Sequence, residues 1–65
     1  MRWIDIHIIA ELLEEEYPSV DVVHIGFLEL HRMVLGLEGF KDEPKRSNEK
    51  ILEAIQAAWI EERAF

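Results

Sequence analysis

Carboxylates are the side chains of this chain best suited to chemistry, and a group of them surrounds one predicted turn. Glu38, Asp42 and Glu43 lie close together along the sequence, just before Pro44. Carboxylate oxygens suit hard or borderline cations such as Ca²⁺, Mg²⁺, Mn²⁺ or Fe²⁺. Because the spacing of an EF-hand loop is absent, any metal site at these three acids should be shallow and weak. The alternative is a solvated acidic loop.

The histidines give weaker indications of a metal site. His7 and Glu11 are one helical turn apart, a spacing that can hold a metal, but a single pair of this kind is more often simply exposed. We expect His31 to be a partly buried, hydrogen-bonded structural residue on the flank of a helix. His24 has no neighbour in the sequence that indicates a role.

Nucleophilic catalysis has little support in the sequence. The chain contains no Cys and no Thr, and Ser19 and Ser47 occupy predicted turn and helix-cap positions. A chain of 65 residues also leaves little room for a deep pocket that excludes water. We therefore expect a protein that is not an enzyme and has no tightly bound cofactor.

Charge is the most informative property of the composition. Fourteen Asp and Glu residues against seven Lys and Arg residues give a net charge of −7. This charge opposes binding to nucleic acid and favours cations or a basic protein surface; the alternative is that it only supplies solubility. No apolar run approaches the ~20 residues of a membrane span. The first residues lack the pattern of a signal peptide, so we expect a cytoplasmic protein that does not bind membranes.

Amphipathic spacing predicts a first helix that begins at Asp5 and ends at Tyr17-Pro18. The Asp5 carboxylate is predicted to cap the following amides, while Ile4 packs on Ile9. The last turn contains three consecutive acids, residues 14–16, which the negative end of the helix dipole disfavours. These acids indicate either a functional site or a merely solvated helix end.

The connection to the second helix is less regular. Asp21 is predicted to cap a single helical turn, and Ile25-Gly-Phe27 could form a short extended piece. The second helix should run from about Leu28 to Glu38, followed by a left-handed Gly39 and a Schellman-type closure that folds Phe40 back on Leu35.

The third helix is the best specified. Pro44 separates it from the second helix, Ser47 is the predicted N-cap, and the helix should run from Asn48 to about Glu62. Its apolar face includes Trp59, which we expect in the core together with Trp3.

These elements predict one domain, residues 1–65, of the mainly α class: a small three-helix domain with a modified winged-helix-like topology. A DNA-reading helix in such a fold would be rich in Arg, Lys, Asn or Gln. The candidate helix instead carries Glu49 and Glu53, one turn apart, so nucleic-acid binding is not expected.

Several motifs match one known family along nearly the whole chain. The most specific is Ser47-Asn-Glu-Lys-Ile-Leu-Glu-Ala-Ile55 followed by Trp59, and further matches are at Trp3 with Asp5, at Tyr17-Pro18, at Phe27 and His31, and at Leu37-Glu-Gly-Phe40 leading into Asp42-Glu43-Pro44. With this spacing the chain resembles the IscX family, small acidic proteins of bacterial iron–sulfur cluster assembly.

The resemblance implies a modified winged-helix fold and binding to the cysteine desulfurase of the pathway, a pyridoxal-phosphate enzyme that supplies sulfur. It also implies weak binding of Fe²⁺ by surface carboxylates, and overlap with the bacterial frataxin on the desulfurase. The leading hypothesis is therefore an adaptor or regulator, and the alternative is a ferrous-iron carrier or sensor.

The chain departs from the family pattern at several positions. Lys41 stands where an acid is usual, Met33 where an aromatic residue is common, and Leu28 where a capping-type polar residue is common. Lys45 and Arg46 add positive charge beside the acidic turn. These changes weaken the case for iron binding more than the case for desulfurase binding.

We expect a monomer that binds the desulfurase through an acidic surface, since opposite charges favour association. The predicted contact residues are Asp21, Glu29, Glu38, Asp42, Glu43, Glu49 and Glu53.

Overall fold

Three α-helices and two short 3₁₀ helices form the fold in the computed structural model, which describes residues 1–64. In chain order the elements are α1 (Ile6–Glu16), η1 (Val22–His24), α2 (Phe27–Leu35), η2 (Pro44–Arg46) and α3 (Glu49–Ala64). The described part of the chain contains no strand, which confirms the mainly α, three-helix prediction. None of its helices is long and apolar enough to cross a bilayer.

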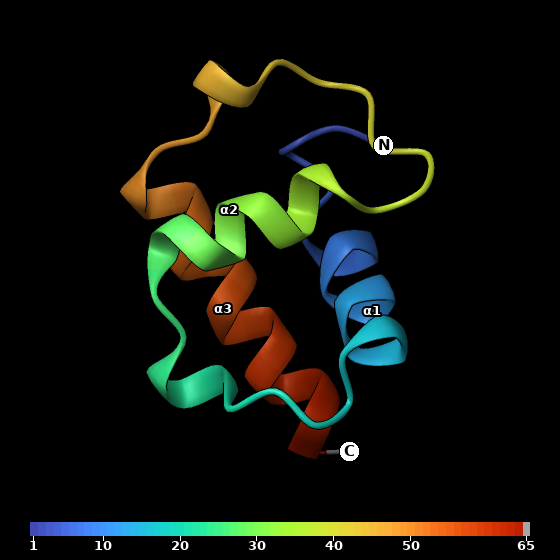
Figure 1. Ribbon diagram of the computed structural model, residues 1–65, viewed down its shortest axis with the longest axis vertical. Coiled ribbons are helices and arrows are strands. Elements are labelled where there is room, and N and C mark those ends of the chain that lie inside the picture. Colours follow the sequence, from blue (N-terminus) through green and yellow to red (C-terminus); the bar gives the residue numbers. More distant parts are fainter. Residues whose placement is uncertain (65) are drawn as a thin grey trace.

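The helices are arranged around α3 (Figure 1). α1 lies alongside α3, while α2 crosses in front of α3 and η1 rests on its C-terminal half. The segment between α2 and α3 passes over the end of the molecule where the N-terminus lies. We call this segment, residues 36–48, the α2–α3 loop. The principal extents are 29 × 21 × 16 Å.

The core contains apolar side chains from all three helices. Both tryptophans are buried, as the sequence predicted. Burial of such side chains supplies most of the stabilisation, about 1.5–3 kcal/mol for each large apolar residue. The largest fully buried side chains are Trp3, Trp59, Ile9, Leu13, Leu30, Ile55 and Val34.

The predicted side-chain cap of α1 is wrong: the residue is at the expected position but does not form the expected hydrogen bond. Asp5 is at the N-cap position, but its carboxylate makes no hydrogen bond to the helix. Instead its Oδ2 accepts the backbone N–H of Arg2 at 2.8 Å, within a turn that the Asp5 N–H closes on the Arg2 carbonyl. Ile4 is 79% exposed, so the predicted staple on Ile9 does not form.

The cap of α3 lies one residue beyond the prediction. The Asn48 side-chain oxygen accepts the backbone N–H of Ile51 at 2.9 Å, which satisfies one of the free amides at the start of the helix. Ser47 does not cap α3; its hydroxyl donates to the Pro44 carbonyl at 3.3 Å. The reason is that η2 extends the preceding turn up to Ser47.

The second helix ends three residues earlier than predicted. Gly36 follows α2 and donates its N–H to the carbonyl of Arg32, so residues 36–38 are outside the helix. Gly39 has the predicted left-handed conformation, with φ of 85°. The Schellman closure is replaced by a turn in which the Phe40 N–H bonds to the Leu37 carbonyl. Ile25 and Gly26 have extended backbone angles, but α2 begins directly after them.

Glu14, the first of the three acids at the end of α1, has a structural role. Its Oε1 accepts the indole N–H of Trp59 at 2.9 Å and the Nε–H of Arg63 at 3.0 Å. The guanidinium of Arg63 also donates to the carbonyls of Tyr17 and Val20. Glu14 therefore joins α1, the following loop and the last turns of α3, whereas Glu15 and Glu16 are exposed.

We expect Glu14→Ala to destabilise the fold by about 1–3 kcal/mol, because the partly buried Trp59 and Arg63 donors would lose their acceptor. Glu15→Ala is the matched control and should change stability by less than about 0.5 kcal/mol. Urea unfolding of the two variants measures the difference. Equal effects of the two substitutions would contradict the assigned role.

Candidate functional site

Trp3 holds two acidic residues of the α2–α3 loop, Asp42 and Glu43, in place. Its indole N–H donates to the Glu43 carbonyl at 2.8 Å, and its backbone N–H donates to the Asp42 carboxylate at 3.1 Å. The indole also stacks on His31, with ring centroids 5.2 Å apart, and meets the edge of Phe40 at 4.8 Å. These side-chain contacts fix the loop together with two main-chain hydrogen bonds to the N-terminal residue. The Lys41 N–H donates to the Met1 carbonyl at 2.8 Å, and the N-terminal ammonium donates to the Gly39 carbonyl at 2.7 Å.

His31 has the structural role that the sequence predicted. Besides stacking on Trp3, it places its Nε2 at 2.9 Å from the Pro44 carbonyl. His31 comes from α2 and Pro44 begins η2, so this contact joins the helix to the loop that follows it. His7, by contrast, is exposed on α1, as expected.

Asp42 is a structural residue rather than a free surface acid. Its Oδ1 accepts the backbone N–H of Glu43 at 2.7 Å, its Oδ2 accepts that of Trp3, and the Arg46 guanidinium is 4.0 Å away. The Glu43 amide, then the Trp3 amide and the nearby Arg46 and Arg2 charges lower the pKa of the Asp42 carboxyl below its ordinary 3.8. Only 9% of the side chain is exposed, so Asp42 offers little surface to a partner.

The three predicted metal ligands share one loop but do not form a metal centre. Glu38 and Glu43 are exposed, while both oxygens of Asp42 already accept backbone amides. Within residues 1–64, no three His, Asp or Glu side chains gather closely enough to hold a metal ion. The geometry does not fit a built iron site, and weak binding of Fe²⁺ at the surface stays a prediction.

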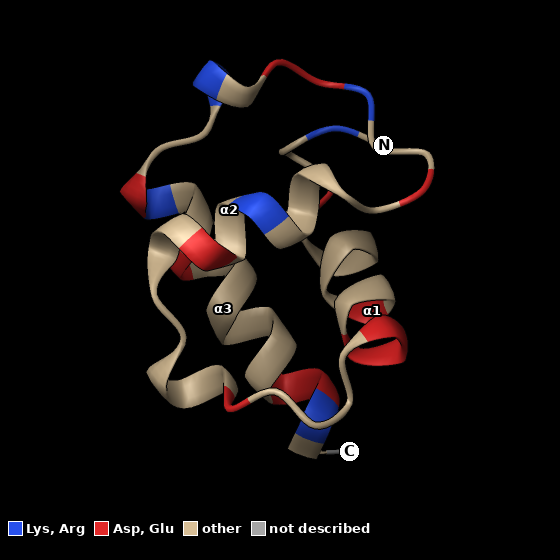
Figure 2. Ribbon diagram, in the orientation of Figure 1, with Lys and Arg blue, Asp and Glu red and all other residues tan. Residues whose placement is uncertain are grey.

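Three other predicted contact residues lie on helices. Glu29 is in the first turn of α2 and Glu49 in the first turn of α3, where the positive end of each helix dipole favours an acid. Glu53 follows one turn after Glu49, and all three side chains are exposed. Figure 2 shows the acids of α2 and of the beginning of α3 on the same side of the molecule. We call these three residues the helical acids.

Asp21 lies apart from the other predicted contact residues. It precedes η1, at the opposite end of the molecule from η2 (Figure 2). Its carboxylate is 2.8 Å from the Nδ1 of His24, and this hydrogen bond is the main cause that lowers the pKa of the Asp21 carboxyl. The partner of His24 was not predicted, although the spacing of three residues around a helical turn could have indicated it.

Positive residues interrupt the acidic surface near the α2–α3 loop. Lys41, Lys45, Arg46 and Lys50 alternate with acids along the segment from residue 41 to residue 50 (Figure 2). The seven predicted contact acids therefore do not form one continuous patch. The helical acids are the group that stable secondary structure holds together.

Comparison with known proteins identifies the family. The family model described as iron-sulphur cluster assembly matches residues 1–64. The chain belongs to this family, the IscX family. The uncharacterized protein PA3808 of Pseudomonas aeruginosa is 52% identical over 63 residues, covering 97% of this chain and 96% of that protein. The resemblance stated from the sequence motifs is confirmed, and with it a role in iron–sulfur cluster assembly.

The lowered pKa of Asp42 predicts a pH-dependent contribution to stability. A carboxyl whose folded-state pKa is depressed stabilises the fold above its unfolded pKa, and this contribution is lost as the pH falls through the folded pKa. We expect Asp42→Asn to be less stable than the parent at pH 7. The difference in stability between the two proteins should narrow below a pH of about 4, because the protonated Asp42 carboxyl of the parent also loses one hydrogen-bond acceptor.

Thermal unfolding of both proteins at a series of pH values measures this difference. Glu38→Gln is the control, since Glu38 is exposed, and its effect should be small at every pH. A gap between Asp42→Asn and the parent that stays constant from pH 7 down to pH of about 2 would contradict the account, because the linkage requires it to close.

Proposed function

We propose that the protein is an adaptor that binds the cysteine desulfurase of iron–sulfur cluster assembly and regulates sulfur transfer. The match to the iron–sulfur cluster assembly family along residues 1–64 is the observation that carries the proposal. The net charge of −7 supports it, because a protein with this charge is attracted to a basic surface on an enzyme.

Burial and hydrogen bonding support some of the predicted contact residues more than others. Asp42 accepts hydrogen bonds from the protein's own backbone and is almost covered, so we assign it to the support of the loop. The helical acids, Glu29, Glu49 and Glu53, are exposed on regular helices. Glu43 is also exposed, in the loop that joins α2 to α3. Helices limit the conformational freedom that is lost on binding, which favours docking through these residues.

Docking on the desulfurase would place the protein in competition with other acidic partners of the same surface. The bacterial frataxin is the partner with which we expect overlap. In this mechanism the protein performs no chemistry itself; it changes which partners reach the desulfurase and how readily sulfur leaves it. Weak binding of Fe²⁺ by exposed carboxylates is a secondary proposal, because both Asp42 oxygens already accept backbone N–H groups.

Affinity for the organism's own desulfurase should fall as ionic strength rises, because opposed surface charges drive the association. We expect Glu53→Lys to weaken binding about tenfold, since it places a base among the helical acids. The control is Glu15→Lys, which makes the same change in net charge at the exposed end of α1 and should weaken binding only about twofold.

Titration calorimetry at low and high salt measures both effects. A dissociation constant that is the same at both salt concentrations would rule out the electrostatic mechanism. Equal losses for Glu53→Lys and Glu15→Lys would instead show that the net charge matters and the position of the helical acids does not.

A further inference from the structure

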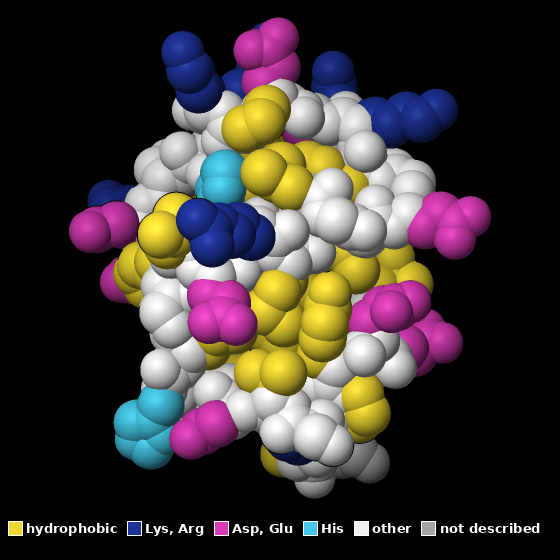
Figure 3. Space-filling model, viewed as in Figure 1, with side chains coloured by type: hydrophobic (Ala, Val, Ile, Leu, Met, Phe, Trp, Pro, Cys, Tyr) yellow, Lys and Arg dark blue, Asp and Glu magenta, His cyan; other side chains and the backbone are white. Residues whose placement is uncertain are grey.

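A surface hollow lies between α2 and the C-terminal end of α1. Its volume is about 580 Å³, within the range of about 300–1,000 Å³ that is typical of binding pockets. Figure 3 shows apolar side chains gathered at the centre of this face, with acidic side chains on both sides of them. The hollow is lined by Tyr17, Gly26, Leu28, Glu29, Arg32 and Met33.

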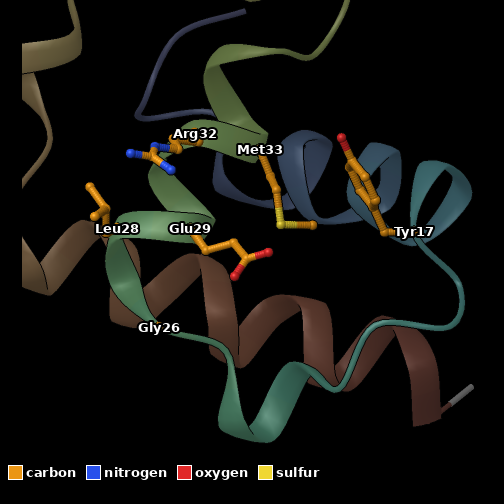
Figure 4. A pocket seen from close by; sticks show the side chains of 6 residues that line it. All are labelled: Tyr17, Gly26, Leu28, Glu29, Arg32 and Met33. Atoms are coloured by element: carbon orange, nitrogen blue, oxygen red, sulfur yellow. The ribbon is translucent and has the colours of Figure 1, made fainter.

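The lining combines a largely buried apolar wall with an exposed apolar rim. The Met33 side chain points from α2 toward the Tyr17 ring across the hollow (Figure 4). A methionine wall can adapt to the shape of an incoming side chain, because the thioether is flexible and polarizable. Leu28 is 69% exposed at the side of the hollow, so it presents apolar surface to an incoming ligand.

The charged side chains of the lining indicate which ligand the hollow would bind. The Glu29 carboxylate is directed into the space between α2 and Tyr17, whereas Arg32 extends away from it along α2 (Figure 4). A base beside the hollow would therefore meet Glu29 first, on a protein that is strongly negative overall. The complementary ligand is an apolar side chain with Lys or Arg next to it.

We infer that this hollow receives an apolar side chain of the desulfurase, flanked by a Lys or Arg that pairs with Glu29. The inference rests on the proposed function and adds to it. The helical acids alone would steer the two proteins together, while burial of apolar area in the hollow would slow their dissociation. Leu28 and Met33 would then determine affinity, and Glu29 would determine orientation.

The test compares Leu28→Ser with a matched control in titrations of the pyridoxal-phosphate form of the organism's own desulfurase. Leu28→Ser should weaken binding at least about tenfold, because the complex would no longer bury the Leu28 side chain. Ile4→Ser removes an apolar side chain that is at least as exposed as Leu28 and is not part of the hollow, and should change affinity by less than about twofold. Thermal unfolding confirms that both variants keep the parent's stability.

A second readout separates apolar contact from charge. Leu28→Ser should keep the parent's salt dependence of the dissociation constant and make the heat-capacity change of binding less negative. Glu29→Gln should do the opposite, reducing the salt dependence while it leaves most of the heat-capacity change.

The outcomes distinguish this inference from the function on which it rests. If the parent binds the desulfurase and Leu28→Ser binds as tightly, the hollow is not the anchor point, while the adaptor function stands. If Leu28→Ser changes only self-association, measured by sedimentation, the occupant is a second copy of the chain and the inference is wrong. If the parent does not bind the desulfurase, both proposals fail together.

Discussion

The contacts of the Trp3 indole are the constraint on which the arrangement of this small protein depends. Trp3 joins the N-terminal segment to residues about two-thirds of the chain away, through hydrogen bonds to Asp42 and to the Glu43 carbonyl. It also packs on His31 of α2 and on Phe40. The α2–α3 loop is long and has no helix besides η2, so these contacts replace regular secondary structure there. An ordered loop in turn fixes where α3 begins.

The other end of the molecule is held by a second polar cluster. Glu14, Arg63 and the Trp59 indole connect α1 to the last turns of α3, and Arg63 also holds the loop that leaves α1. The two clusters leave α2 crossing in front of the α1–α3 pair. The hollow, with Glu29 in its lining, lies between α2 and the end of α1. A rigid scaffold of this kind suits docking, because little conformational entropy is lost when the surface meets a partner.

The sequence predicted the features that depend on local spacing. The apolar stripes gave three helices and the buried tryptophans, and Gly39 gave a left-handed turn. Prediction from the sequence failed where groups distant in the chain form hydrogen bonds to the same side-chain atoms. The Asp42 carboxylate looked like a surface ligand until Trp3, distant in sequence, proved to occupy it. Ser47 and Asp5 are good cap residues, but neighbouring turns engage their side chains. The hollow brings Tyr17, which follows α1, together with residues of α2, so no local pattern could indicate it.

The central claim is that helix-borne acids on one side of the molecule, and not the whole negative surface, dock on the desulfurase. Residue-resolved NMR of the labelled protein during titration with unlabelled desulfurase tests it most directly. The account predicts that the signals of Glu29, Glu49 and Glu53 change first, while those of Glu15 and Glu16 at the end of α1 stay unaffected. Changes of equal size at all exposed acids, or changes confined to the end of α1, would contradict the claim.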